Sequence, residues 1–281
     1  MLDTISFIGG GVMAESMIRR LLDQRLIAAT GITVSGPREA RRTELVARYG
    51  VRTTPGNHEA ARGADIVVLS VKPQMLSRIV PELRGALTAD QLVLSILAGG
   101  RLATIAEALA HPAVVRAMPN APGQIGEGMT VWTATASVTE ARLEQARAIF
   151  LALGREIFVD DEKLLDMATA VSGTGPTYVL MVIEALIDAA VHLGLPRHLA
   201  HELVIETMRG SVAFARGSDR HPAELRNLVT SPGGTSAEAI YQMEKGTLRT
   251  VLSKAVWAAY QKSRLLGDSV GQSEPRRPVD A

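Results

Sequence analysis

The chain begins with a short apolar segment that runs directly into a glycine-rich turn. Thr4–Ile8 is predicted to be a buried strand, and Gly9–Ala14 has the spacing G-x-G-x-x-A ahead of an amphipathic helix. In this strand-turn-helix context Gly9 permits the tight turn, and Gly11 lets the backbone approach a pyrophosphate. Ala14 allows the helix to pack closely on the strand. The motif therefore predicts an α/β fold that opens with a Rossmann-type dinucleotide-binding unit.

Strand and helix patterns keep alternating to about residue 160. Further strands are expected at 32–34, 64–71, 92–96, 113–117, 129–133 and 156–159, with a helix at 139–153. In a doubly wound sheet, ligands lie outside the carboxyl ends of the parallel strands. The segments that start at Ser70, Ala98 and Pro119 are therefore expected to line a ligand crevice.

No strand is predicted after Glu162. The remaining pattern gives helices at 163–170, 175–193, 196–215, 223–229, 235–243 and 247–266. We expect an α/β doubly wound sheet at 1–160, an all-helical domain at 161–267, and a disordered polar tail at 268–281. Because the long helices carry apolar faces with no sheet to cover them, the helical domain is expected to form a homodimer.

Composition excludes several classes of function. Lys plus Arg is 30 and Asp plus Glu is 29, so the net charge of +1 gives no support for nucleic-acid binding. The absence of cysteine excludes disulfides and thiolate metal sites. Without a signal-peptide pattern, the expected location is cytoplasmic. A membrane span is not expected either, because Glu184, Asp188 and His192 interrupt the most apolar helix along one face.

The tip of the second strand suggests which dinucleotide is bound. Ser35-Gly36-Pro37-Arg38 follows the strand, where an NAD-preferring site usually has an acidic residue. A hydroxyl and arginine side chains suit a 2′-phosphate, so NADPH is expected, with NADH as the alternative. Arg41 and Arg42 belong to the same cationic group, or at least one of them lies on the wet face of a helix. Lys72 is either catalytic or a support for the cofactor, and we favour the second role.

A second glycine-rich turn, Ser231–Ser236, precedes the helical segment near Ala237–Ile240. Thr235 is expected to be the N-cap of that helix, and the free N–H groups at its start could hold a substrate carboxylate. The alternative is an ordinary capped turn.

Other candidate residues favour no separate site. His198 and His201 are three apart on a helix, but no third ligand accompanies them, so no metal is expected. Glu184 and Asp188 are interpreted as a polar stripe near an interface. Ser172 lacks the G-x-S-x-G context and a triad partner, which argues against a hydrolase.

Five motifs together resemble the pattern of the pyrroline-5-carboxylate reductase family. They are Val71–Pro73, Met118–Pro122, Ala168–Tyr178, Gly194–Pro196 and Ser231–Ser236. The resemblance runs from Ile5 to about Leu266, with the motifs in the same order. The Ser-Gly-x-Gly-Pro and Ser-Pro-Gly-Gly-Thr pair is specific to the family, whereas the first glycine motif is not.

The resemblance implies NAD(P)H-dependent reduction of the cyclic imine 1-pyrroline-5-carboxylate to L-proline, the last step of proline biosynthesis. It also implies a Rossmann domain, a helical dimerisation domain and assembly into rings of dimers. Thr169 is implied as the hydrogen-bond partner of the imine nitrogen. The substrate-binding residues that it implies are Ser172, Asp219, Gly234, Thr235 and Ser236. The cofactor-binding residues are Gly9, Gly10, Gly11, Val12, Met13, Ala14, Ser35, Arg38, Asn57, Ser70, Val71, Lys72 and Ala98.

This reaction needs few acid–base groups, because a protonated cyclic imine is already electrophilic. The enzyme mainly has to place the acceptor carbon against the nicotinamide and orient the nitrogen. The chain departs from the family pattern at Val12, Leu97, Thr177 and Ser236.

Three alternative functions remain open: a reductase of a related cyclic imine, a catalytically weak cofactor-binding paralogue, and a β-hydroxyacid dehydrogenase. The last class places a catalytic lysine along its long interdomain helix. Between Gly175 and Leu195 this chain has no lysine, which counts against that class.

Overall fold

The computed structural model describes residues 2–269, which divide into two compact units. Of these residues, 2–174 and 259–269 form the first unit, and 175–258 form the second. The sequence predicted a division at 160/161, and the prediction of a tail from 268 onward lies mostly outside the described residues. Asp268 and Ser269 themselves continue the last helix.

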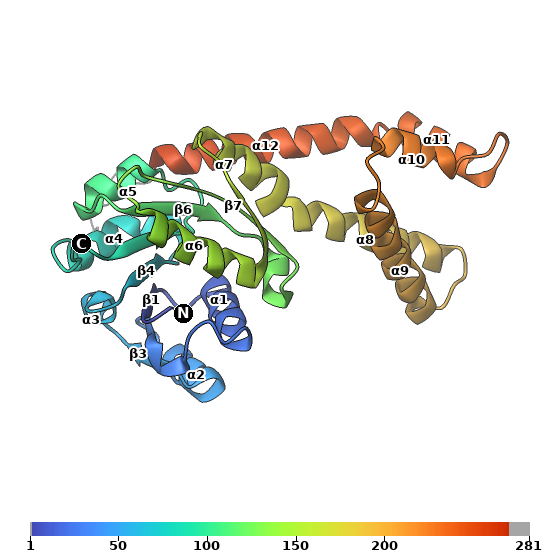
Figure 1. Ribbon diagram of the computed structural model, residues 1–281. Helices are drawn as coiled ribbons and strands as arrows, with labels where there is room; N and C mark the ends of the chain where they lie inside the picture. Colours follow the sequence, from blue (N-terminus) through green and yellow to red (C-terminus); the bar gives the residue numbers. More distant parts are fainter. Residues whose placement is uncertain (1, 270–281) are drawn as a thin grey trace, which may run out of the picture. The chain divides into compact units, whose positions relative to one another are not determined.

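An eight-stranded sheet forms the centre of the first unit, in the order β3-β2-β1-β4-β5-β6-β7-β8 (Figure 1). The six strands from β3 to β6 are parallel, β7 is antiparallel to β6, and β8 is parallel to β7. The strands are β1 Ile5–Ile8, β2 Ile32–Ser35, β3 Arg52–Thr54, β4 Ile66–Leu69, β5 Leu92–Ser95, β6 Val114–Met118, β7 Gly128–Ala134 and β8 Gly154–Phe158. Chain order reverses at β1, which lies between β2 and β4, as in the doubly wound sheet expected from the sequence.

Six helices of the described first unit connect parallel strands, and a seventh follows the last strand. In this unit they are α1 Val12–Asp23, α2 Glu39–Tyr49, α3 Asn57–Ala61, α4 Leu76–Leu83, α5 Leu102–Leu109, α6 Glu140–Leu153 and α7 Lys163–Ala168. Short 3₁₀ turns occur at Ala29–Gly31, Pro73–Met75 and Ala121–Ile125, and a π-helical turn follows α7 at Thr169–Gly173.

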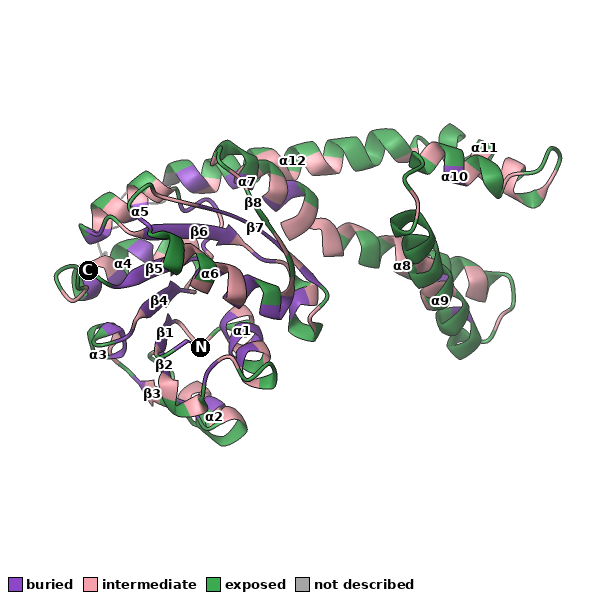
Figure 2. Cartoon of the chain, viewed as in Figure 1, coloured by how far each residue is buried: buried purple, intermediate pink, exposed green. Residues whose placement is uncertain are grey.

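Two apolar clusters cover opposite faces of the sheet. Phe7, Val68 and Trp132 belong to one cluster, whereas Ile8 and Leu69 belong to the other. Successive residues of β1 and β4 thus point to opposite faces, both of which are buried (Figure 2). Continuous apolar strands such as Ile66–Leu69 are what a parallel sheet covered by helices on both sides requires.

The second unit is helical in all of its described elements. It contains α8 Gly175–His192, α9 Arg197–Arg216, α10 Pro222–Leu228, α11 Thr235–Lys245 and the first half of α12 Leu248–Ser269. Within this unit α8 packs on α9. Much of both helices is exposed when one chain is considered alone (Figure 2). The exposed large apolar side chains include Leu180, Met181 and Phe214.

Candidate active site

The first glycine turn joins β1 to α1 at the carboxyl edge of the sheet. Gly9 has a φ of +106°, and a Cβ there would lie 2.9 Å from Val71 Cγ1, so the position requires glycine. A Cβ on Gly10 would lie 2.9 Å from Leu45 Cδ1. Gly11 differs, because the nearest atom to its Cβ position is the Ser70 carbonyl oxygen at 4.0 Å. Two glycines therefore face packed protein and the third faces open space.

The start of α1 fits a dinucleotide pyrophosphate. Gly11 is the N-cap residue, and no side chain caps the helix. Val12 and Met13 lie in the first turn, whose N–H groups have no intrahelical acceptor, and Ala14 is buried against the strand. Open space beside Gly11 and uncapped N–H groups form the arrangement that accepts a phosphate at a helix N-terminus. The residues present thus fit the expected cofactor.

The neighbouring strand ends lie beside this turn. Ser70 follows β4, and its hydroxyl donates to the Gly9 carbonyl over 2.8 Å, which fixes the glycine turn to β4. Val71 packs against Gly9, and Lys72 is exposed at the start of the Pro73–Met75 turn. Ala98 follows β5 and is partly exposed. Because β1, β4 and β5 are parallel, these residues share one edge of the sheet.

Ser35 and Asn57 are paired beyond the end of β2. The Ser35 hydroxyl is fully buried and donates to Asn57 Oδ1 over 2.7 Å. This bond orients the Asn57 amide so that its NH₂ group is turned away from Ser35. The structure therefore places the Ser35 hydroxyl in the interior, directly beside Asn57.

The arginines of α2 have two kinds of environment. Arg41 donates from Nε to the Gly10 carbonyl over 2.9 Å and is ion-paired with Glu15 and Glu44. Arg42 donates to the Gly36 carbonyl over 2.7 Å. The alternative interpretation was that at least one of these arginines is simply solvated. Both instead donate hydrogen bonds to backbone carbonyls. Arg38 is exposed at the N-cap of α2, with no hydrogen bond to its guanidinium among the described residues.

Glu15 joins α1 to α2 beneath the glycine turn. Its carboxylate accepts from Arg41, Arg48 and Tyr49. Although burial raises the pKa of Glu15, these hydrogen bonds outweigh it and hold that pKa below its ordinary value. Burial and the bond to Glu15 raise the pKa of Tyr49. The contact between α1 and α2 below the glycine turn is therefore made of charged side chains whose charges neutralise one another.

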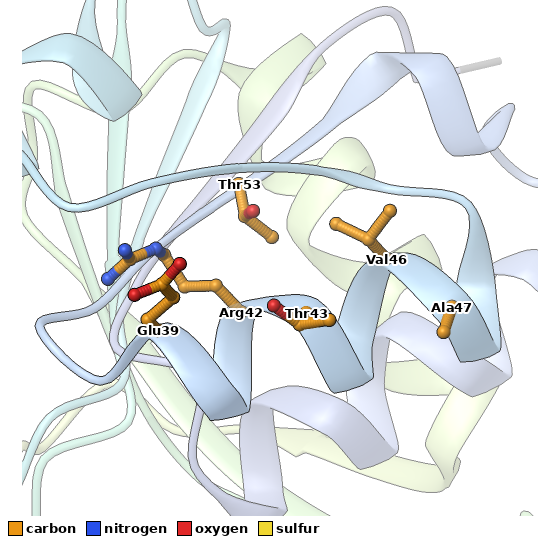
Figure 3. A pocket seen from close by; sticks show the side chains of 6 residues that line it. All are labelled: Glu39, Arg42, Thr43, Val46, Ala47 and Thr53. Carbon is orange, nitrogen blue, oxygen red and sulfur yellow. The ribbon is translucent and has the colours of Figure 1, made fainter.

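A pocket of about 360 Å³ lies along α2 at the β3 edge of the sheet (Figure 3). Glu39, Arg42, Thr43, Val46 and Ala47 line it from the helix, and Thr53 lines it from β3. Arg42, one of the arginines considered for the cofactor phosphate, lines this pocket, whereas none of the residues implied by the family resemblance does.

Thr169 begins the π-helical turn that continues α7. Its hydroxyl is buried and donates to the Leu165 carbonyl over 2.7 Å. The backbone carbonyl of Thr169 accepts from both the N–H and the hydroxyl of Thr174. Since the Thr169 hydroxyl has used its proton, the oxygen presents lone pairs and can accept from a further donor.

Ser172 lies in the same π-helical turn and is held from β6. Asn120 donates from Nδ2 to the Ser172 carbonyl over 3.2 Å and to its hydroxyl over 3.3 Å. Asn120 Oδ1 in turn accepts from the Met129 N–H. Gly173 lies so close to Met118 that a Cβ would be 2.9 Å from the methionine Cε. The end of β6 thus fixes the turn that contains Thr169 and Ser172.

The turn Ser231–Ser236 lies in the second unit and opens α11. The expectation that Thr235 caps this helix is wrong: Gly234 is the N-cap, and Thr235 is the first helical residue. Glycine occupies the cap because a Cβ there would lie 2.5 Å from the Ser231 hydroxyl oxygen. The Thr235 side chain makes no capping bond and is exposed, so its hydroxyl and the first N–H groups of α11 remain available to an anion.

Asp219 lies on the exposed connection between α9 and α10. No hydrogen bond or ion pair joins it to the Ser231–Ser236 turn within residues 2–269. His198 and His201 are both exposed on α9, and no group of three potential metal ligands occurs in the described part of the chain.

Two family models match the chain, one in each half. Residues 162–266 match the family described as pyrroline-5-carboxylate reductase dimerisation. Residues 4–99 match the family described as NADP oxidoreductase, coenzyme F420-dependent. A pyrroline-5-carboxylate reductase from Synechocystis is 42% identical over 263 residues, which cover 94% of this chain and 98% of the relative. The chain belongs to the pyrroline-5-carboxylate reductase family.

Other relatives agree along almost the whole length. The family member from Pseudomonas aeruginosa is 39% identical and covers 95% of this chain and 98% of its own. A solved pyrroline-5-carboxylate reductase from Coxiella burnetii has a TM-score of 0.84 at 34% identity, with 95% and 99% of the two chains covered. A Plasmodium falciparum member, solved with NADP bound, has a TM-score of 0.85 at 31% identity, with 95% and 100% covered. The fold, family and cofactor class expected from the sequence are confirmed.

Sequence reasoning missed a group of residues that supports the site. Arg116 of β6 is buried and pairs with Glu162 and Asp166 at 2.8 Å each. Asn120 was noted only as part of a motif. A buried arginine in an apolar strand is the signal that could have pointed to the Arg116 network, because such a charge needs partners.

Proposed function

We propose that this chain reduces 1-pyrroline-5-carboxylate to L-proline with NADPH, using Thr169 and the Ser231–Ser236 turn to bind the two polar ends of the substrate. Family membership supports the reaction. When bound, the cofactor supplies the hydride. The chain has to hold the cofactor, accept a hydrogen bond from the iminium nitrogen and bind the carboxylate.

The observation that carries the role of Thr169 is the direction of its own hydrogen bond. Its hydroxyl proton points to Leu165, so its oxygen can only accept from a ligand. A protonated cyclic imine offers one N–H donor, and its positive charge strengthens a hydrogen bond to the lone pairs of the Thr169 oxygen. Acceptance by Thr169 favours the iminium form and orients it, so the acceptor carbon stays electrophilic without a strong general acid.

The carboxylate is assigned to the second glycine turn. Uncapped N–H groups at the start of α11 and the free Thr235 hydroxyl suit an anion, with Ser236 alongside. For Asp219 the structure adds no support beyond its exposure. On the cofactor side, the proposed ligands are the glycine turn, Asn57 and Arg38, with Ser35 and Ser70 orienting their neighbours.

A pair of Thr169 variants tests this assignment. Thr169→Val keeps the shape but removes the acceptor, and Leu165 still accepts the backbone N–H of residue 169. We expect kcat/KM for the imine to fall about 10- to 100-fold, while NADPH binding is unchanged. Thr169→Ser keeps the hydroxyl and should stay near the wild-type value. Equal rates in all three proteins would remove Thr169 from the mechanism.

Two of the three alternative functions predict different results in the same assay. A reductase of a related cyclic imine would reach a higher kcat/KM with a six-membered ring imine than with pyrroline-5-carboxylate. A cofactor-binding paralogue would bind NADPH without oxidising it in the presence of either imine.

We further propose that dimers formed through 162–266 assemble into rings, and that the chain works in the cytoplasm. The family's dimerisation model supports association through this segment. One helical run of the described residues, Lys163–His192, is long and apolar enough to cross a membrane by length and composition. Its Glu184 and Asp188, together with the dimerisation match, support a protein interface instead. Recovery of the chain in an alkaline-washed membrane fraction would contradict this location.

A further inference from the structure

The end of α12 packs directly against the loop after β5. Gly99 and Gly267 touch through their backbones: a Cβ on Gly99 would lie 2.5 Å from the Gly267 nitrogen, and one on Gly267 would lie 3.0 Å from the Gly99 oxygen. Only two glycines permit so close an approach. The loop continues from Ala98, one of the residues expected to contact the cofactor.

The same part of α12 also contacts α7. Ser263 is buried, and its hydroxyl donates to Asp166 Oδ1 over 3.1 Å. Asp166 accepts from Arg116 as well, at 2.8 Å. Its neighbour Leu165 is the residue whose carbonyl accepts the Thr169 hydroxyl. Asp166 therefore lies one residue away from the acceptor of that bond.

A second carboxylate connects these two contacts. Glu162 Oε1 accepts from the Leu102 N–H and from Arg116, both at 2.8 Å. Leu102 is the first residue of α5, so Glu162 caps the helix that follows the Ala98–Arg101 loop. An exposed ion pair between Arg101 and Asp268 closes the group. Figure 1 shows the end of α12 alongside α5 and α7.

We propose that residues 259–269 of α12 are a positioning segment for the reductase site. Gly267 fixes the position of the Ala98–Arg101 loop and thereby that of Ala98, one of the expected cofactor contacts. Ser263 acts through Asp166 and fixes the position of the Thr169 hydroxyl. Neither residue touches a ligand, and the role rests on the proposed function. Packed elements of this kind change a distant site when they are displaced.

Two substitutions separate positioning from simple support of the fold. Gly267→Ala improves helix propensity, so α12 itself is not weakened, but its methyl group pushes on the Gly99 carbonyl. Ser263→Ala removes one hydroxyl and leaves Asp166 paired with Arg116. The control is Lys262→Ala, an exposed neighbour on the same helix. All variants are made in the full chain and are compared only after their oligomeric state has been shown to equal that of the wild type.

The measurements are the NADPH dissociation constant from fluorescence without turnover, kcat and KM for pyrroline-5-carboxylate, and the melting temperature. Gly267→Ala should weaken NADPH binding about three- to tenfold. Ser263→Ala should lower kcat/KM for the imine by a similar factor and leave the NADPH dissociation constant within twofold. Lys262→Ala should match the wild type in every measurement.

The proposal is overturned if both variants keep wild-type ligand parameters, or if all parameters change together with the melting temperature. In either case the segment only stabilises the fold. Failure of the proposed function looks different: the wild type itself would not oxidise NADPH with the imine. NADPH binding by Gly267→Ala would then still decide the role of this contact.

Discussion

Arginines in and near the loop after β2 have separate tasks. Arg41 and Arg42 donate to the carbonyls of Gly10 and Gly36 and so support the backbone. Arg38 alone among these three is exposed without a guanidinium partner in the described structure. A guanidinium that is not neutralised by protein groups is suited to a 2′-phosphate.

Arg38→Ala is therefore expected to change cofactor preference. The NADPH dissociation constant should rise about tenfold, because a charged hydrogen bond is lost, whereas NADH binding should stay the same. Arg62→Ala, at another exposed arginine, is the control. Parallel losses for NADPH and NADH would show that Arg38 does not contact the 2′-phosphate.

Individual residues also mark the limit of sequence reasoning. The conformational role of Gly9 was predictable, because the strand and helix on either side allow only a tight turn. The hydrogen bond of Ser35 was not predictable, because its partner Asn57 comes from another part of the chain. Thr235 was expected at the N-cap, but the helix begins at Thr235 itself and Gly234 is the N-cap.

At the scale of elements, α1 and α2 are joined by Glu15, whose lowered pKa makes this contact depend on pH. The contribution of Glu15 to stability is fully present above about pH 4.5, the ordinary pKa of the group, where the carboxylate is charged in both states. It is lost as the pH falls through the lower pKa of the folded state.

Glu15→Gln should thus lower the free energy of unfolding by about 1 kcal/mol at pH 7. Urea titrations at pH 7 and pH 3 test this, and the difference from the wild type should shrink at pH 3. Glu107→Gln, at an exposed glutamate of α5, is expected to have no effect at either pH. A difference that is equal at both pH values would contradict the assignment.

The boundaries of helices were predicted well where the local sequence of the helix determines them. The boundaries of α8 to α12 follow apolar periodicity with glycine or proline at the junctions, and the structure agrees within a few residues. The π-helical turn at Thr169–Gly173 could not be predicted. Its register depends on Met118 at the end of β6 and on Asn120 just beyond that strand. The docking of α12 on Gly99 is equally a long-range contact.

At the scale of the whole molecule, the alternation of strand and helix predicted the doubly wound order. The division between units could not be read in the same way, because Ala259–Ser269 returns to the first unit although it continues a helix that begins in the second. Contacts between segments far apart in the chain decide such boundaries.

The exposed apolar faces of α8 and α9 indicate association between chains. Leu180 and Met181 are more than 60% exposed in a single chain, which is costly in water and consistent with the family's dimerisation match. Native mass spectrometry should give an even number of chains at micromolar concentration. A monomer under those conditions would contradict association through 162–266.

Hydride transfer from NADPH to a pyrroline carboxylate is the reaction that we propose for this chain. The most direct measurement uses NADPH deuterated at the transferred position of the nicotinamide, with synthetic pyrroline-5-carboxylate and product analysis by NMR. We expect L-proline with one deuterium on the ring carbon that is bonded to nitrogen but does not bear the carboxylate. Thr169→Val should form the same product more slowly. Oxidation of the cofactor without deuterium in proline, or no proline at all, would contradict the account.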